Sequence, residues 1–387
     1  MSDPGATPEP FSERLLSWFA RHGRHDLPWQ HPRDPYRVWV SEIMLQQTQV
    51  RTVLPYFERF MARFPDVQAL AAAPLDLVIQ LWAGLGYYAR ARNLHAAAQR
   101  VTVDHRGQFP DTLEGLQALP GIGRSTAGAI LSQAFGQRAA VLDGNVRRLL
   151  ARHAGIEGWP GQPKVLARLW AVAESRLPHV RLADYTQAAM DLGNAVCRAR
   201  SPACHACPVA SDCVARLSGK TQQIPAPKPR RARPKRSAQA LMLRSAVGEV
   251  WLERRPPSGL WGGLWCLPLS QLDEPWSTYA TRMQLRGEAQ CPLPVIRHAF
   301  THFDLELSAM CMPPECLTQG VRESTDGAWI KLDHPATWPG MPAPIRRLLE
   351  QLRAQEAGVV PVPHHPTGND PCPEPFSASS SAVRPKV

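Results

Sequence analysis

Four cysteines within seventeen residues constrain this chain more than any other feature of its sequence. Cys197, Cys204, Cys207 and Cys213 lie in CRARSPACHACPVASDC with the spacing C-x6-C-x2-C-x5-C. The N-terminal MSDPGATPEPFSERLL lacks the basic and apolar regions of a secretory signal, so we expect a reducing location, where clustered thiols bind metal. Zinc sites usually separate two cysteine pairs by a longer insert, and one compact loop suits an iron–sulfur cluster at least as well. Spacing alone leaves both metals open.

The pattern along the chain divides it into a helical part, a linker, a mixed part and a tail. Residues 1–220 carry apolar residues at three- and four-residue spacing, interrupted by prolines, which is typical of helices. Residues 221–236 are basic and proline-rich and predict an extended linker. The alternating stretches AQALMLRS, GEVWLERR and HFDLEL, followed by the helix-like APIRRLLEQLRAQ, predict a smaller α+β domain over residues 237–356. The Pro- and Ser-rich residues 357–387 are expected to be disordered.

The positive charge is concentrated in the helical part and the linker. The formal net charge is +11; residues 1–220 carry +7, residues 221–236 carry +6, and residues 237–387 carry −2. A polyanion is therefore expected to bind the first half of the chain and the linker. No apolar run approaches membrane-spanning length, so no membrane partner is expected.

The glycine-rich stretch LPGIGRSTAGA is a candidate phosphate-binding hairpin. It lacks the P-loop pattern and follows a helix-like segment, DTLEGLQA, where a dinucleotide fold would have a strand. Gly121 and Gly123 allow a tight turn, and a helix starting near Arg124 would offer free N–H groups to a phosphate. An ordinary turn between helices is the alternative, which this stretch alone leaves open.

Two acidic residues have contexts suited to chemistry. Glu42 lies in VWVSEIMLQQTQV, where apolar residues three and four positions away would desolvate its carboxyl and raise its pKa. A glutamate on a polar helix face is the alternative. Asp143 precedes an apolar helical run in VLDGNVRRLL, which is typical of a helix N-cap. A carboxylate that stays ionised in a reaction site is the functional alternative.

Five stretches carry a resemblance to a known family: SEIMLQQTQV, LWAGLGYYARARNLH, LPGIGRSTAGAI, VLDGNVRR and MDLGNAVC. Together with the cysteine loop they resemble the endonuclease III superfamily of DNA glycosylases and, within it, the bacterial adenine DNA glycosylases. The resemblance implies a multidomain chain: an all-α helix-hairpin-helix glycosylase domain (hairpin at about 112–135) with a [4Fe-4S] loop at 197–213, followed by an α+β Nudix-like domain. It implies a [4Fe-4S] cluster on the four cysteines. The implied partner is double-stranded DNA with adenine opposite 8-oxoguanine or guanine, bound by a monomeric, cytoplasmic, nucleoid-associated enzyme.

The same resemblance implies roles for individual residues. Removing a base from DNA is glycoside cleavage, in which the leaving base is protonated and positive charge grows on the sugar. By this resemblance, Glu42 matches the general acid that protonates the base and then helps to activate water. Asp143 matches the carboxylate that stabilises the sugar cation, and Asn145 matches a hydrogen-bonding partner in the same site. Gln47 and Tyr87 match residues that wedge into the duplex beside the mispair. The residues that match the adenine pocket are Arg24, Trp29 and Gln187. Packing or surface roles are the alternative for these five residues.

Two departures from related patterns limit the expected chemistry. Ser125 stands where bifunctional relatives have a lysine that forms a Schiff base, which implies a monofunctional enzyme. ERRPPSGLWGGLWCLP resembles the start of a Nudix signature, but no acidic magnesium-binding cluster follows it, so diphosphate hydrolysis is not expected. In RHAFTHFDLEL, residues Phe300, Thr301 and His302 match readers of 8-oxoguanine, with threonine where relatives often have serine.

Three other functions remain as alternatives. A bifunctional glycosylase and lyase, as in endonuclease III, would form a trappable imine with its DNA substrate. A non-catalytic iron–sulfur DNA-binding protein would bind without releasing a base. A nucleotide hydrolase working through the C-terminal domain would release diphosphate products.

Overall fold

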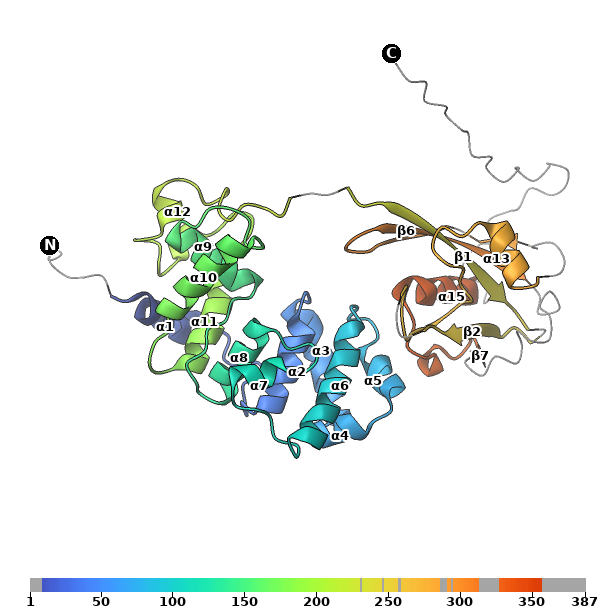
Figure 1. Cartoon of the computed structure of the whole chain (residues 1–387), viewed down its shortest axis with the longest axis horizontal. Coiled ribbons are helices and arrows are strands. Elements are labelled where there is room, and N and C mark those ends of the chain that lie inside the picture. Colours follow the sequence, from blue (N-terminus) through green and yellow to red (C-terminus); the bar gives the residue numbers. More distant parts are fainter. Residues whose placement is uncertain are drawn as a thin grey trace, which may run out of the picture.

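The structure is a computed structural model in which a helical part precedes a part built on two β-sheets (Figure 1). The described residues are 9–229, 232–245, 247–256, 259–285, 291–293, 295–312 and 327–356. The tail predicted to be disordered, residues 357–387, lies outside them. The predicted fold class, an all-α domain followed by an α+β domain, is confirmed.

The helical part runs from α1 to α12. Its helices are α1 (Phe11–His22), α2 (Pro35–Leu45), α3 (Val50–Arg63), α4 (Val67–Ala72), α5 (Leu75–Trp82), α6 (Ala89–Asp104), α7 (Leu113–Gln117), α8 (Arg124–Ala134), α9 (Gly144–Ala154), α10 (Pro163–Ser175), α11 (Leu182–Ala195) and α12 (Val214–Leu217). Local sequence signals mark where several of these helices begin. In α2, Pro35 occupies the first turn and the Asp34 side chain accepts a hydrogen bond from the Arg37 N–H at 3.0 Å.

The helices enclose two separate apolar cores. In α3, Val53, Phe57 and Phe60 recur at three- and four-residue spacing, and all three are buried. They pack with residues of α2, α4, α5, α6 and α8 into the first core. α1 and α9 to α11 form the second core together with residues of the cysteine loop. α8 contacts α2 on one side and α11 on the other, so the two cores lie next to each other.

One predicted helical run is interrupted. The apolar spacing of residues 34–64 continues without a visible break, but α2 ends at Leu45 and α3 begins at Val50. Gln47 between them has a φ of 59°, in the left-handed region that no right-handed helix contains. The interruption places a turn directly after the last turn of α2, which carries Glu42.

Residues near both ends of the predicted 221–236 linker pack with the folded parts. Ile224 is 3% exposed in the second core, and its carbonyl accepts a hydrogen bond from Arg152 Nε at 2.9 Å. At the other end, Lys235 already belongs to the first strand. An apolar side chain near one end and strand pairing at the other therefore draw residues of the predicted 221–236 linker into the two folded parts.

Among the described residues, the second part contains two sheets and the α-helices α13 and α15. The elements are β1 (Lys235–Leu243), β2 (Val250–Arg254), β3 (Trp265–Cys266), α13 (Trp276–Arg282), β4 (Cys291–Pro292), β5 (Ile296–Ala299), β6 (Asp304–Met312), β7 (Gly327–Ile330) and α15 (Ala343–Glu356). β6 pairs with β1 in parallel and with β4 and β5 antiparallel, whereas β2 pairs antiparallel with β3 and β7.

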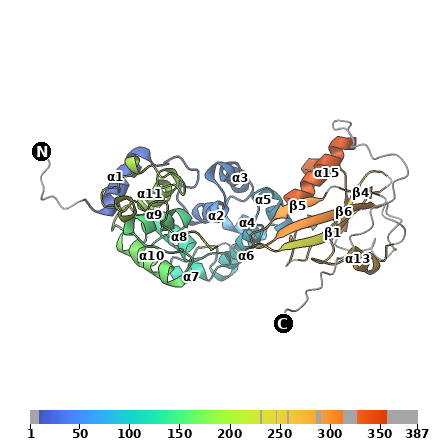
Figure 2. The same cartoon turned by 90° about the horizontal axis from the view of Figure 1, so that it is seen from above.

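Alternation along β1 explains why this sheet is covered on both faces. Ala240 and Met242 lie in a core that includes α15 residues, whereas Leu241 and Leu243 lie in a separate core with Tyr279 of α13. Figure 2 shows α15 and α13 on either side of β1 and β6.

The two parts contact each other through α5 and α6. Arg92 donates a hydrogen bond to the Gly262 carbonyl at 2.7 Å, and Arg254 pairs with Asp76 at 2.6 Å. Trp261 packs against both the first helical core and the sheet core. Within the described part of the chain, no helix has the length and apolar character needed to cross a membrane.

Candidate active site and DNA interface

A cavity of about 1120 Å³ lies between the two helical cores. Its walls come from the loop after α1, the end of α2, the turn before α3, and from α8, α9 and α11. Many of the residues singled out from the sequence line it: Arg24, Trp29, Glu42, Gln47, Ser125, Asp143, Asn145 and Gln187. Polar side chains from widely separated segments therefore meet in one cavity, as a reaction site requires.

Glu42 is half-buried on the last turn of α2. Its Oε1 accepts a hydrogen bond from Gln133 Nε2 at 3.2 Å. Burial, together with the nearby Asp143 carboxylate, raises the pKa of Glu42 to about 7, although the Gln133 hydrogen bond opposes the shift. A substantial fraction of Glu42 is therefore protonated at neutral pH and can donate that proton.

Asp143 caps α9 and also lines the cavity. Its Oδ1 accepts the Val146 N–H at 2.7 Å. Burial raises the pKa of Asp143 above its ordinary value, while the Val146 and Asn145 N–H groups and the charges of Arg148 and Arg147 oppose that rise. The helix N-terminus also favours the ionised form. Both interpretations of this residue, cap and site carboxylate, thus have a structural basis.

Asn145 is connected to the cysteine loop through one arginine. Arg148 Nη2 donates a hydrogen bond to Asn145 Oδ1 at 2.9 Å and another to the Gly193 carbonyl at 2.6 Å. Its Nε donates to the Cys197 carbonyl at 2.7 Å. The orientation of Asn145 therefore depends on the same side chain that holds the start of the cysteine loop. The spacing of residues around Arg148 in the sequence gives no sign of this role.

A buried carboxylate holds two of the candidate pocket residues. Asp191, 3% exposed, accepts the Arg24 N–H at 2.9 Å and Gln187 Nε2 at 2.8 Å. Its signal in the sequence is the four-residue spacing from Gln187, which places both on one face of α11. Trp29 is 3% exposed and lies edge-on against Phe57, with ring centroids 5.3 Å apart, so it packs in the core as well as lining the cavity.

The glycine-rich stretch forms a helix, a turn and a helix, from α7 to α8. Gly121 has a φ of 79°, and a Cβ on it would lie 2.9 Å from the Asn93 Cβ, so the turn requires glycine there. Gly123 precedes α8, has open space around its Cα, and leaves the helix without a side-chain cap. The exposed N-terminus of α8 can therefore accept a phosphate.

Ser125 connects this hairpin to the reaction site. Its Oγ accepts a hydrogen bond from the Leu142 N–H at 3.1 Å, and Leu142 precedes Asp143. Ser125 also lines the cavity. The Ser125 side chain is therefore in direct contact with the segment that presents Asp143.

The two wedge candidates lie on exposed turns. Gln47 is exposed at the edge of the cavity. Tyr87 lies between α5 and α6, is 52% exposed and has a φ of 49°. Exposed side chains on turns are available for contact with a duplex.

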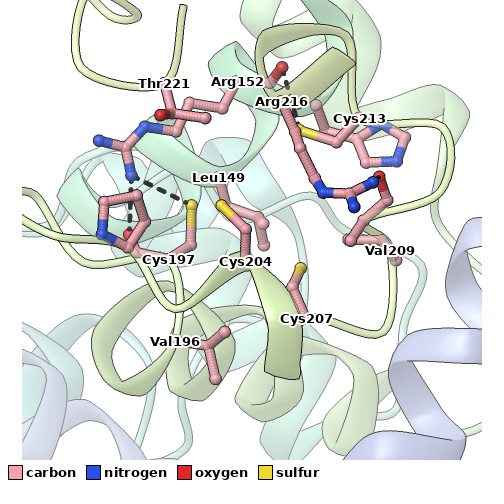
Figure 3. Close-up of a pocket in the computed structure, with 13 residues that line it drawn as sticks. Leu149, Arg152, Val196, Cys197, Cys204, Cys207, Val209, Cys213, Arg216 and Thr221 are labelled. Carbon is pink, nitrogen blue, oxygen red and sulfur yellow. Dashed lines mark hydrogen bonds between the residues drawn. The ribbon is translucent and has the colours of Figure 1, made fainter. Parts of the chain in front are cut away.

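The four cysteines surround a space beside α9. Cys197, Cys204, Cys207 and Cys213 line one pocket (Figure 3). Among the described residues, no group of three or more His, Cys, Asp or Glu side chains is placed to hold a metal ion. Four thiolates from one loop are a ligand set that iron–sulfur clusters use. Arg152, 3% exposed, donates to Cys197 Sγ at 3.4 Å and to the Arg198 carbonyl at 2.7 Å.

The candidate lesion-reading residues form the tip between β5 and β6. The Phe300 N–H donates to the Phe303 carbonyl at 2.8 Å, and the two rings stack with centroids 4.6 Å apart. Thr301 and His302 are exposed at the tip. Phe300 is half-buried against Trp261 and His298, so it supports the tip while its neighbours face solvent.

Comparison with known proteins matches each part of the chain. Residues 40–175 match the HhH-GPD superfamily of base excision DNA repair proteins, residues 197–213 the iron–sulfur binding domain of endonuclease III, and residues 239–351 the NUDIX domain. The adenine DNA glycosylase of Buchnera aphidicola subsp. Acyrthosiphon pisum (strain APS) is 34% identical, over 89% of this chain and 97% of the relative. The adenine DNA glycosylase of Homo sapiens is 47% identical over 55% of this chain and 41% of its own. A solved thermostable thymine-DNA glycosylase is 27% identical over 54% of this chain and 95% of its own, with a TM-score of 0.49.

Fold, hairpin and cysteine loop define a helix-hairpin-helix DNA glycosylase of base excision repair, followed by a Nudix-like domain. Identity over nearly the full length of both chains narrows this class: the chain belongs to the adenine DNA glycosylase family. DNA is its partner, and it carries a [4Fe-4S] cluster, with its iron–sulfur binding domain at residues 197–213. The predictions of fold class, enzyme class and cofactor are confirmed.

Proposed function

We propose that the cavity excises adenine opposite 8-oxoguanine or guanine and leaves the DNA strand intact. The observation that carries this proposal is the pairing of two unlike carboxyl groups in one cavity. Glu42 is a desolvated acid with a pKa of about 7, and Asp143 lies at the N-terminus of α9. A pair of carboxyl groups in one site can divide the acid and stabiliser roles of glycoside cleavage.

The reaction follows from these positions. The Glu42 proton moves to a ring nitrogen of the adenine as the bond between sugar C1′ and the base breaks, and the electrons of that bond leave with the base. The Asp143 carboxylate stabilises the positive charge that grows on the sugar. Ionised Glu42 then accepts a proton from the water that adds to C1′. The products are free adenine and an abasic site. Asn145 is a hydrogen-bonding partner beside Asp143 in this reaction.

The surrounding residues bind the substrate. We assign Arg24, Trp29 and Gln187 to the flipped adenine, Gln47 and Tyr87 to the duplex wedge, and the turn at Gly121 and Gly123 to a phosphate. The [4Fe-4S] cluster, when bound, cross-links the loop that Arg148 connects to Asn145. We propose that the protein acts as a monomer on chromosomal DNA in the cytoplasm.

Opposite-base preference is assigned to the β5–β6 tip, and Thr301→Val tests this role. Valine keeps the shape of threonine but removes the hydroxyl. We expect the variant to reduce the preference for 8-oxoguanine over guanine about tenfold, the effect of one lost hydrogen bond. Single-turnover rates on duplexes with adenine opposite 8-oxoguanine, guanine or thymine provide the measurement, and Thr281→Val on α13 is the matched control. An unchanged ratio for Thr301→Val would remove Thr301 from lesion recognition.

Strand cleavage depends on residue 125 in this proposal. Ser125→Lys places an amine beside the segment that carries Asp143, and an amine can form an imine with the opened sugar. We expect this variant to form a protein–DNA adduct that borohydride traps. The unaltered protein should release the base without forming a matching amount of this adduct. Ser125→Ala, which also loses the Leu142 hydrogen bond, separates the new amine from that loss. Stoichiometric trapping of the unaltered protein would contradict a monofunctional enzyme.

A further inference from the structure

Both wedge candidates have an unusual backbone conformation. Gln47 has a φ of 59° and Tyr87 a φ of 49°, values at which a side chain carrying a Cβ is disfavoured. Such conformations persist where surrounding contacts impose them. The two turns are far apart in sequence, on either side of α3 to α5. A contact that imposes both conformations must therefore be tertiary.

A single buried side chain connects the two turns. Arg90 is 9% exposed and belongs to the first turn of α6. Its guanidinium donates hydrogen bonds to six acceptors, which flank Gln47 in one turn and precede Tyr87 in the other. Around Gln47 they are the carbonyls of Ile43 at 2.9 Å, Met44 at 2.8 Å and Gln46 at 2.5 Å and the Thr48 hydroxyl at 3.2 Å. Before Tyr87 they are the carbonyls of Leu85 and Gly86, both at 3.3 Å.

The guanidinium also satisfies the end of a helix. Ile43 and Met44 belong to the last turn of α2, where backbone carbonyls have no partner within the helix. A cation at this end is favoured by the helix dipole. The Arg90 guanidinium lies over the Tyr87 ring at 5.5 Å and the Trp82 ring at 5.3 Å. It thus supports the Tyr87 side chain as well as the Tyr87 turn.

Lysine could not replace these contacts. The guanidinium is a planar group with five N–H donors in fixed directions, whereas an ammonium group has three donors at one point. None of the ion pairs among the described residues includes Arg90, so its partners are carbonyl and hydroxyl oxygens and aromatic rings. Its contacts define geometry rather than neutralise charge.

We propose that Arg90 is the positioning residue of the duplex wedge formed by Gln47 and Tyr87. Arg90 holds the turns that carry these two side chains in their binding conformation before DNA binds. The inference rests on the wedge role in the proposed function. Tips that are fixed in the free protein lose no conformational freedom on binding, so more of the binding energy remains for unstacking the adenine. Loss of Arg90 should therefore slow the extrusion of a stacked base and spare the later chemistry.

Two DNA substrates separate this role from a purely structural one. The first is a fully paired duplex with adenine opposite 8-oxoguanine. In the second, the base pairs flanking that mispair are mismatched, so the unstacking cost is already reduced. We expect Arg90→Met to release adenine at least tenfold more slowly from the first duplex, and within about threefold of the wild-type rate from the second. Arg90→Lys should recover only part of the loss. Arg63→Met is the control, because Arg63 is an exposed arginine over the Phe64 ring at 5.5 Å.

Each outcome bears on the proposal. If Arg90→Met slows adenine release equally on both duplexes, Arg90 acts through the end of α2 and Glu42. That result would overturn the positioning role of Arg90 in the wedge. Full recovery by Arg90→Lys, or no loss in either variant, would also overturn it. If Arg90→Met does not fold, the ratio of the two rates for Arg90→Lys gives the same test. If wild-type protein releases no adenine from either duplex, the proposed function fails, and this inference fails with it.

Discussion

Glu42→Gln should reduce single-turnover adenine release by at least about 10²- to 10⁴-fold, the usual contribution of a positioned general acid. Glutamine keeps the size of the side chain and can still bond Gln133, but it has no proton to transfer to the base. DNA affinity and the absorption of the iron–sulfur cluster should remain at wild-type levels, because Glu42 contacts neither the α8 N-terminus nor the cysteine loop in the structure. A variant with a near-wild-type rate would exclude Glu42 as the acid.

The pH dependence of the wild type provides the control for this variant. Since the pKa of Glu42 is raised to about 7, its protonated form disappears as the pH rises through 7, and the rate should fall about tenfold per pH unit above that point. The raised pKa also means that ionised Glu42 destabilises the fold at higher pH. Glu42→Gln should therefore lose this limb of the profile and unfold at a higher temperature than the wild type above pH 7. A lower unfolding temperature would indicate a structural defect instead.

Asp143→Asn should slow adenine release by about 10²- to 10³-fold, the range found when one group that stabilises transition-state charge is removed. The carboxylate faces the sugar cation in the proposed reaction, and a neutral amide cannot stabilise that charge. Asparagine is as good an N-cap as aspartate, so the bond to the Val146 N–H and the stability of α9 should persist.

Asp143→Ala serves as the matched comparison. Alanine removes the cap as well as the charge and should cost about 1 kcal/mol of stability. If activity instead follows stability, so that Asp143→Asn is active and Asp143→Ala is not, the cap alone accounts for this residue.

Local sequence signals predicted the elements that carry the site. The glycines of LPGIGRSTAGA predicted a turn and a helix starting near Arg124, and α8 begins at that residue. The position of Asp143 before an apolar run predicted the N-cap of α9. These signals succeed because caps and tight turns depend on interactions within a few residues.

Long-range contacts within the site were not predictable in the same way. Gln133, which bonds Glu42, lies 91 positions from it, and Asp191 lies 167 positions from Arg24. Arg90 lies in an ordinary helical sequence, and nothing local shows that its side chain joins two turns. Periodicity identifies which face of a helix is buried, but it does not identify the partner of a polar group on that face.

The cysteine loop and the sheet show the same limit. Spacing predicted a metal site at Cys197, Cys204, Cys207 and Cys213 but left zinc and iron–sulfur open, and family membership decides for [4Fe-4S]. Strand alternation predicted β1 and β6, whereas their parallel pairing depends on the path of the chain between them.

The most direct test measures free adenine and strand integrity in one reaction. Holo protein with its cluster is mixed in excess with a duplex that contains one adenine opposite 8-oxoguanine, and the base and the strand are quantified over time. We predict one free adenine per abasic site, with the strand intact until hot alkali cleaves it. A duplex that keeps its adenine while bound to the protein, or strand cleavage that keeps pace with base release, would contradict it.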